Sequence, residues 1–168
     1  PRAFEILPAD IIVTTQDASA TYGDDQPEFT ALILESDLQI GDTEADLFPQ
    51  GLDISVPCTQ CDVNGSPYMI SAAAVINNIS GNYNVTFDNS GLFTVSKFDL
   101  TVTVDDGAIT YGDTGPFAFT VTSDPAALPY GELLDDVLGT ISFTPSDGCK
   151  TDTVIAVSPE VQADNYNV

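Results

Sequence analysis

The sequence has no histidine, no tryptophan, and only three lysines and arginines in 168 residues. Without histidine, neither a Ser-His-Asp triad nor a Cys-His pair can form, and no glycine-rich phosphate loop is present. Nucleic-acid binding requires clustered cations, so nucleic acid is excluded as a partner. We therefore expect a protein that is not an enzyme and that carries no cofactor.

Long apolar runs are also lacking. No stretch approaches the roughly 20 apolar residues that a membrane-spanning helix needs, so we expect no membrane insertion. The sequence shows no signal peptide and does not begin with methionine, which predicts a mature or internal segment.

Acidic residues are abundant, at 26 Asp and Glu, and give a net charge of −23. They are scattered between strand-like runs in a chain that is 43% hydrophobic, which predicts a solubilising surface rather than disorder. The alternatives are life in salty water, where acids hold a hydrated shell, and calcium binding, because Ca²⁺ is held by several oxygen ligands. Its candidate ligands are the adjacent acids Asp24 and Asp25, and Asp105 and Asp106, although no EF-hand pattern surrounds them.

Cysteine is sparse, with Cys58, Cys61 and Cys149. The C-x-x-C pair at Cys58 and Cys61 lies between Pro57 and an Asp-Val-Asn-Gly stretch that is typical of a loop, and a zinc ribbon would need a second pair. We expect a local disulfide between Cys58 and Cys61, which fits an extracellular compartment. Cys149 has no evident partner in the sequence.

An internal repeat organises the chain. Thr-Tyr-Gly-Asp occurs at residues 21–24 and again at 110–113, and nine of eighteen positions are identical between residues 10–27 and 99–116. Asn-Tyr-Asn-Val at 82–85 recurs at 165–168. A period near ninety residues indicates tandem modules.

Three segments follow from this repeat. Residues 8–97 form a first β repeat, and residues 98–168 form a second β repeat that lacks its final hairpin. Residues 1–7 match the end strand of a preceding repeat, since Phe4-Glu5-Ile6-Leu7 aligns with Phe93–Ser96. We expect either a longer array or a strand that is supplied by another molecule.

The hydrophobic period is two, which predicts a mostly β fold. Strands are expected at 12–15, 28–33, 52–56, 68–71, 83–87 and 92–95, and at 100–104, 117–121, 141–143, 153–157 and 166–168. Asp88–Gly91 is typical of a hairpin turn between the strands at 83–87 and 92–95. At most a short helix is expected in each module, at Asp42–Leu47 and at Glu132–Leu138 before Gly139. Two tandem small β modules follow, either β-grasp-like or an immunoglobulin-like sandwich.

The repeated residues are predicted to serve the architecture. Glycine permits the positive φ of a tight turn, and aspartate can bond to the following backbone. A buried tyrosine keeps its hydroxyl on a polar partner. The structural candidates are Tyr22, Gly23 and Asp24, with Tyr111, Gly112 and Asp113 in the second copy, and Tyr83 and Tyr166 in the second anchor. The alternative is that the tyrosines bind a sugar.

These motifs together resemble the MBG-type (YGX-type) repeats of very large secreted adhesin-like proteins, many from Bacteroidota. The resemblance is carried by Tyr22-Gly23-Asp24, Pro27, residues 82–87 and 91–95, and by their counterparts in the second copy. It implies a non-enzymatic β module in tandem arrays at the cell surface.

We therefore expect a structural or cell-adhesion module of a long extracellular adhesin or stalk, whose partners are neighbouring repeats. The alternative is a filament subunit, in which Phe4, Glu5, Ile6 and Leu7 complete the open sheet edge of the next identical subunit, head to tail. A third hypothesis is a carbohydrate-binding module for surface glycans.

Overall fold

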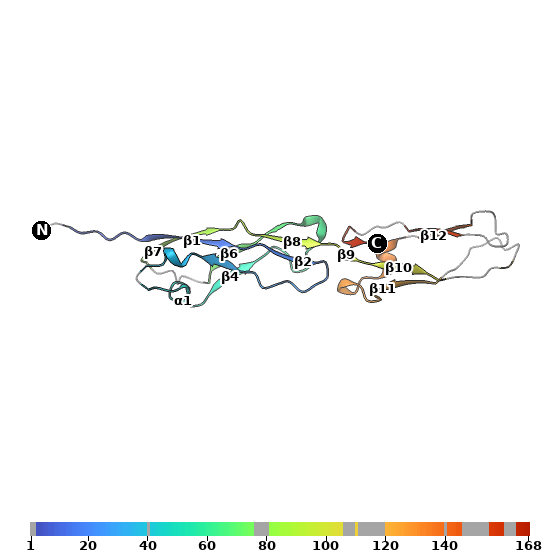
Figure 1. Cartoon of the computed structure of the whole chain (residues 1–168), viewed down its shortest axis with the longest axis horizontal. Helices are drawn as coiled ribbons and strands as arrows, with labels where there is room; N and C mark the ends of the chain where they lie inside the picture. The colour runs from blue at the N-terminus through green and yellow to red at the C-terminus, as the bar shows by residue number, and fades with distance from the viewer. Residues whose placement is uncertain are drawn as a thin grey trace. The chain divides into compact units, whose positions relative to one another are not determined.

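The computed structural model describes residues 3–39, 41–75, 81–105, 110, 120–139, 141–145, 155–159 and 164–168 (Figure 1). Its contacts divide the chain into two compact units. The first comprises Pro1–Ala20 and Asp25–Val95, and the second comprises Thr21–Asp24 and Ser96–Val168. Strands dominate, with short helices between them, so the prediction of a mostly β fold is confirmed. Thr21–Asp24, which the sequence places inside the first repeat, is part of the second unit.

Short strands succeed one another along the first repeat. They are β1 (Ala9–Thr15), β2 (Ala18–Thr21), β3 (Ala31–Ile33), β4 (Leu52–Ser55), β5 (Tyr68–Met69), β6 (Ser71–Ala74), β7 (Tyr83–Asp88) and β8 (Leu92–Ser96). The helical segments are η1 (Glu35–Asp37), α1 (Glu44–Leu47) and η2 (Val63–Gly65). The strand orders are β3-β1-β7, β2-β8-β5 and β4-β6.

Strand β1 lies at the centre of the first sheet. It pairs in parallel with β7 from Ala9↔Tyr83 to Thr14↔Asp88, and antiparallel with β3. Figure 1 shows β1 and β7 side by side. Alternate side chains of β1 point inward, as the period of two predicts. The resulting core contains Ile11, Val13, Ile33, Leu47, Phe48 and Tyr83. Burial of each large apolar side chain stabilises the unit by about 2 kcal/mol.

The predicted hairpin between β7 and β8 is wrong. β7 pairs with β1, whereas β8 pairs with β2 and β5 in a different sheet. The chain changes sheets at Gly91, whose amide donates to Oγ1 of Thr15 at 2.9 Å. A Cβ on Gly91 would lie 2.7 Å from the carbonyl carbon of Thr15. The turn-like Asp88–Gly91 sequence therefore permits a close crossing of two backbones rather than a chain reversal.

The second unit contains β9 (Phe98–Asp99), β10 (Thr101–Val104), β11 (Val121–Asp124), η3 (Pro129–Gly131), α2 (Leu134–Leu138), β12 (Ile141–Pro145), β13 (Ile155–Pro159) and β14 (Tyr166–Asn167). β10 pairs with β11, β12 with β13, and β14 in parallel with β9. The short helix is present as α2, and Gly139 follows it with φ of 60°. Val137 and Leu138 at the end of α2 are fully buried and contribute to the core of this unit.

The repeated Asn-Tyr-Asn anchor has the same structure in both units. The tyrosine starts a strand that pairs in parallel with the first strand of its unit. The following asparagine bonds to an aspartate on that neighbour: Asn84 Nδ2 donates to Asp10 Oδ1 at 2.9 Å, and Asn167 Nδ2 donates to Asp99 Oδ1 at 2.9 Å. The anchor thus fixes the register of the parallel pair in each unit.

Candidate functional site

The Tyr-Gly-Asp turn at Thr21–Asp24 follows directly from the end of β2. Asp24 donates its amide to Thr21 O at 3.0 Å, and Thr21 N donates to Asp24 Oδ2 at 3.1 Å. Gly23 has φ of +93°, where an L side chain is strained. A Cβ there would also lie 2.5 Å from the ring of Pro129. The turn therefore needs glycine both for its backbone conformation and for its contact with Pro129.

Tyr22 is the centre of this site, and only 4% of its surface is exposed. Its hydroxyl donates to Glu132 Oε1 at 3.0 Å, and its amide donates to Ser96 O at 2.8 Å. Its ring makes edge-on contacts with Tyr130 and Tyr166, with centroids 5.3 and 5.7 Å apart. Such T-shaped pairs add about 1 kcal/mol each beyond burial. These contacts explain why the turn belongs to the second unit.

Glu132 joins the two buried tyrosines of the site. One carboxylate oxygen accepts the Tyr22 hydroxyl, and the other accepts the hydroxyl of Tyr166. Burial raises the pKa of the Tyr166 phenol, and its hydrogen bond to Glu132 raises it further. The Tyr166 phenol is therefore a neutral donor at physiological pH. The arrangement holds the Thr21–Asp24 turn in place.

The first unit has a matching group around Tyr83, which is 6% exposed. Its hydroxyl donates to Asp42 Oδ2 at 2.7 Å and accepts the amide of Gln39 at 2.8 Å. Burial raises the pKa of Tyr83, and the bond to Asp42 adds to that effect. Within the described part of the chain, no donor reaches Oδ1 of Asp42. A cavity of about 460 Å³ lies here, lined by residues 6–9, 39, 42 and 81–83.

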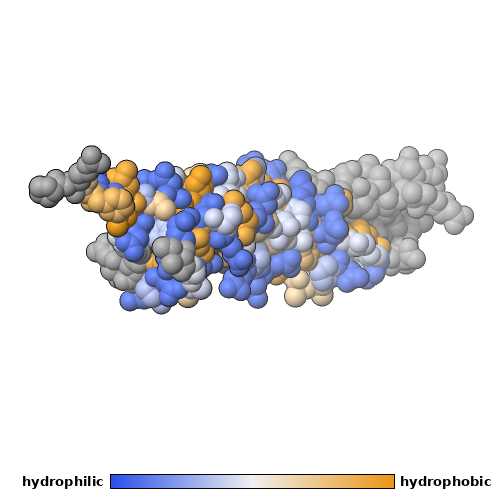
Figure 2. All heavy atoms as spheres, turned by 60° about the vertical axis from the view of Figure 1, so that its left-hand side comes forward, coloured by the Kyte–Doolittle hydropathy of each residue, from blue (hydrophilic) through white to orange (hydrophobic). Residues whose placement is uncertain are grey.

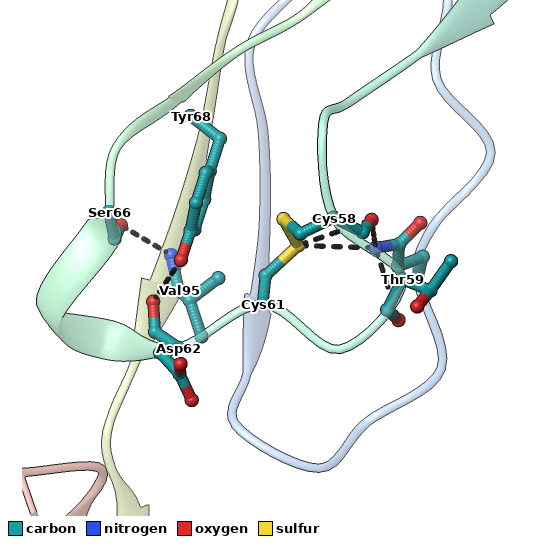
Figure 3. Close-up of a disulfide and its surroundings, with 8 residues drawn as sticks. Cys58, Thr59, Cys61, Asp62, Ser66, Tyr68 and Val95 are labelled. Carbon is teal, nitrogen blue, oxygen red and sulfur yellow. Dashed lines mark hydrogen bonds between the residues drawn. A yellow bond between two sulfur atoms is a disulfide. The ribbon is translucent and has the colours of Figure 1, made fainter.

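Cys58 and Cys61 are joined by a disulfide, with Cα atoms 5.3 Å apart (Figure 3). The loop is held to its surroundings by side chains. Gln26 Nε2 donates to Cys58 O at 2.8 Å, and the hydroxyl of Tyr68 donates to Asp62 O at 2.8 Å. Just beyond the loop, Ser66 Oγ accepts the amide of Val95, near the end of β8, at 2.8 Å. The bonded pair secures a loop, and no redox partner lies in these contacts.

The candidate calcium ligands do not form a metal site in the described ranges. Asp24, Asp25 and Asp105 are exposed there, and no group of three His, Cys, Asp or Glu side chains comes together. Asp24 instead uses Oδ2 to close its own turn. Asp106 lies outside the described residues.

The remaining predicted residues are the exposed Phe4–Leu7 segment and four residues outside the described ranges. Phe4, Ile6 and Leu7 are 88%, 83% and 73% exposed, and Glu5 between them is exposed as well. The candidates that lie outside the described residues are Tyr111, Gly112, Asp113 and Cys149.

Sequence reasoning missed the acceptor side of the site, which is formed by Pro129, Tyr130 and Glu132. A weak signal exists at an offset of 90, where residues 38–42 (LQIGD) align with residues 128–132 (LPYGE). Each stretch has leucine first, glycine fourth and an acid fifth. Gly41 and Gly131 share a left-handed backbone, with φ of 80° and 77°. Only two of these five positions are identical, so the pattern does not stand out without the structure.

Comparison with known proteins identifies the family. Residues 11–94, half of the chain, match the MBG domain of YGX type. No curated protein and no solved structure matches the chain. The matched range includes both the Tyr-Gly-Asp turn and Tyr83. MBG domains are structural modules that occur in surface proteins and are not a known enzyme family. The chain belongs to the YGX-type MBG domain family.

Proposed function

We propose that this chain is a non-enzymatic tandem β repeat of a long extracellular adhesin or stalk at the cell surface. The observation that carries the proposal is the position of Thr21–Asp24. The first repeat contributes this turn, yet its tyrosine is buried against Tyr130, Tyr166 and Glu132 in the second unit. One module thus supplies part of the compact unit of the next, as expected for an array stabilised by nearest-neighbour contacts.

The surface charge fits a crowded array. A net charge of −23 makes neighbouring stalks repel one another, and physiological salt screens that repulsion beyond ~8 Å. Among the residues that the structure describes, no helix is long and apolar enough to cross a membrane. The proposed role of the module is mechanical: it projects other parts of the array from the cell and sets the distance between them. Any adhesive ligand would be bound elsewhere on the array.

The test is made on the producing cells. Antibodies raised against the chain should label intact cells, and protease added outside should remove that label. The denatured, reduced polypeptide that they detect should be far larger than 17.7 kDa. Labelling only after the cells are broken open would refute the surface location, and a mass near 17.7 kDa would refute the long array.

A second function is favoured by the exposed Phe4–Leu7 segment. This segment aligns with Phe93–Ser96 by its position before the repeat, and β8 lies between β2 and β5 in its sheet. In β8 the corresponding Phe93 is 2% exposed, whereas Phe4 is 88% exposed. A segment that aligns with β8 but lacks the neighbours of β8 is suited to completing the sheet of another molecule. Repetition of that step, head to tail, would produce an open filament.

Phe4→Glu tests strand donation, because a charge at the position of Phe93 cannot be buried without a partner. The matched control is Leu133→Glu, at another exposed apolar residue (66%). We expect electron microscopy to show filaments of the wild type and of the control, and only short particles of Phe4→Glu. Filaments of unchanged length in Phe4→Glu would reject strand donation.

Glycan binding has no supporting observation. An aromatic platform needs exposed rings, but Tyr22, Tyr83 and Tyr166 are all buried. In the described ranges, the exposed aromatic side chains are Phe4 and Tyr130.

A further inference from the structure

We propose that the groove between strand β4 and residues 26–31 is a docking site for an extended, positively charged segment of another protein, which adds a strand to the free edge of β4. The inference goes beyond the mechanical role proposed above. It adds a protein partner bound to the side of the module, separate from any adhesive ligand. The residues that line the groove lie between 26 and 59, inside the first unit and inside the range that matches the family.

The groove has a volume of about 760 Å³, which is within the range of ligand-binding clefts. One wall is β4 with the residues that follow it as far as Thr59. The other wall is the segment of residues 26–31 that leads into β3. Glu44, the first residue of α1, also lines the groove.

The backbone on both walls is available for pairing. Strand β4 pairs with β6 along one edge, from Leu52↔Ala74 to Ser55↔Ser71, and its other edge has no strand partner among the described residues. Residues 26–29 make no backbone–backbone hydrogen bond within the described part of the chain. An unpaired edge of this kind can bind an extended segment through main-chain hydrogen bonds.

Side chains alternate along both walls in the way that a strand requires. The half-buried apolar side chains are Pro27, Phe29 and Ala31 on one wall, and Leu52, Ile54 and Val56 on the other. The exposed residues between them are Glu28, Thr30, Asp53 and Ser55. An added strand with an apolar residue at every second position would complete the burial of the half-buried set.

Charge decides which kind of segment fits. Glu28 and Glu44 line the groove, and Asp53 is exposed on β4. No residue between 3 and 96 is lysine or arginine, so the partner must bring the positive charge. On the face that Figure 2 shows, hydrophilic side chains are mixed with exposed apolar ones. The matching segment therefore alternates lysine or arginine with apolar residues.

A second copy of the chain is a poor occupant for the same reason. Two β4 edges placed side by side would bring the acids of one groove against those of the other. Like charges on neighbouring strands are destabilising, so the acids of the edge oppose self-pairing while they attract a basic strand.

The disulfide loop connects the two walls at one end of the groove. Gln26, on the first-named segment, donates Nε2 to Cys58 O at 2.8 Å and to Cys61 Sγ at 3.2 Å. Cys58 lines the groove and is bonded to Cys61. Because these contacts fix the walls before a partner arrives, less ordering is needed on binding.

A synthetic peptide tests the groove. The probe is Lys-Val-Lys-Val-Lys-Val-Lys with blocked ends and a fluorescent label, which is basic on one face and apolar on the other when extended. The comparison peptide is Lys-Lys-Lys-Lys-Val-Val-Val, with the same composition and charge. Fluorescence anisotropy with the full chain in about 0.15 M NaCl measures the affinity for each peptide.

We expect the alternating peptide to bind at least about tenfold more tightly than the block peptide. Glu28→Lys should weaken its binding by about fivefold. The matched control is Glu35→Lys, at an exposed glutamate of the same unit that does not line the groove, and it should weaken binding by less than about twofold. At saturation, hydrogen exchange should slow in fragments that cover β4 and stay unchanged in those that cover β7.

Four outcomes overturn the docking proposal. Equal affinities for the two peptides would mean that the net charge of −23 attracts any basic chain. Equal weakening by Glu28→Lys and Glu35→Lys would place binding outside the groove, and unchanged exchange in β4 at saturation would exclude strand addition. Self-association without peptide that slows exchange in β4 would assign the edge to a second copy. The labelling of intact cells decides the proposed surface function separately from all of these.

Discussion

Replacement of Tyr22 by alanine is expected to destabilise the second unit, although residue 22 lies in the first repeat. The side chain is 4% exposed, packs edge-on against Tyr130 and Tyr166, and bonds to Glu132. Removal of a buried aromatic ring of this kind costs about 3 kcal/mol. A cost of that size raises the opening equilibrium of the second unit by about a hundredfold.

Hydrogen exchange measured by mass spectrometry shows which part of the chain loses stability. Peptides that cover α2 and β14 should exchange about a hundredfold faster in Tyr22→Ala, while peptides that cover β7 should be unchanged. Tyr83→Ala is the reciprocal control and should accelerate β7 instead. Tyr22→Phe removes only the hydroxyl and should have a smaller effect, about 1.5 kcal/mol, because the bond is to a carboxylate. Unchanged exchange in α2, or equal acceleration of α2 and β7, would refute the placement of the turn in the second unit.

Other perturbations give further predictions. The pKa of Tyr166 is raised in the folded state, so the stability that its phenol contributes is complete below the unfolded pKa near 10 and is lost as pH rises above it. The urea midpoint of Tyr166→Phe should therefore fall less between pH 9 and pH 11 than that of the wild type. Parallel declines of the two midpoints would contradict this. Gly91→Ala should destabilise the first unit by at least about 2 kcal/mol in urea denaturation, because its Cβ would meet the Thr15 backbone at 2.7 Å; a variant as stable as the wild type would show that the crossing can relax. The thermal midpoint should not change when a chelator replaces calcium, since no three-ligand group exists in the described ranges; a midpoint that rises with added calcium would contradict this.

The sequence predicts the local features of the fold well. Period-two alternation identifies β1, where every second residue is buried, and the end of α2 at Gly139 follows from the preference of glycine for a helix terminus. The Asn-Tyr-Asn anchor identifies the repeat, and its asparagines hold equivalent strand pairs in the two units. These features depend on neighbours in sequence or on short motifs, which is why a single sequence reveals them.

Pairing partners are harder to predict. Asp88–Gly91 has the composition of a hairpin turn, but that composition states only that the backbone can bend or be approached closely. The structure uses Gly91 for a crossing beside Thr15, and β7 and β8 find their partners in different sheets. The sequence also could not identify the partner of Tyr22, because Glu132 is 110 residues away. The residue that aligns with Glu132 in the first repeat is an aspartate, Asp42, so no identical residue marks the position.

The position of the Tyr-Gly-Asp turn also bears on how such genes change in length. Each repeat of the sequence carries Thr-Tyr-Gly-Asp early and a tyrosine later. The structure shows one contact of such a turn, in which Tyr22 of the first repeat packs on Tyr166 and donates to Glu132, both from the second repeat. If the boundaries of a longer array are all built in this way, unequal recombination that inserts or deletes one whole period leaves one turn and one tyrosine-and-acid pair at every new boundary. Such a gene can thus lose or gain whole modules without a new contact having to evolve. A deletion of part of a period, by contrast, leaves a buried tyrosine without its carboxylate partner.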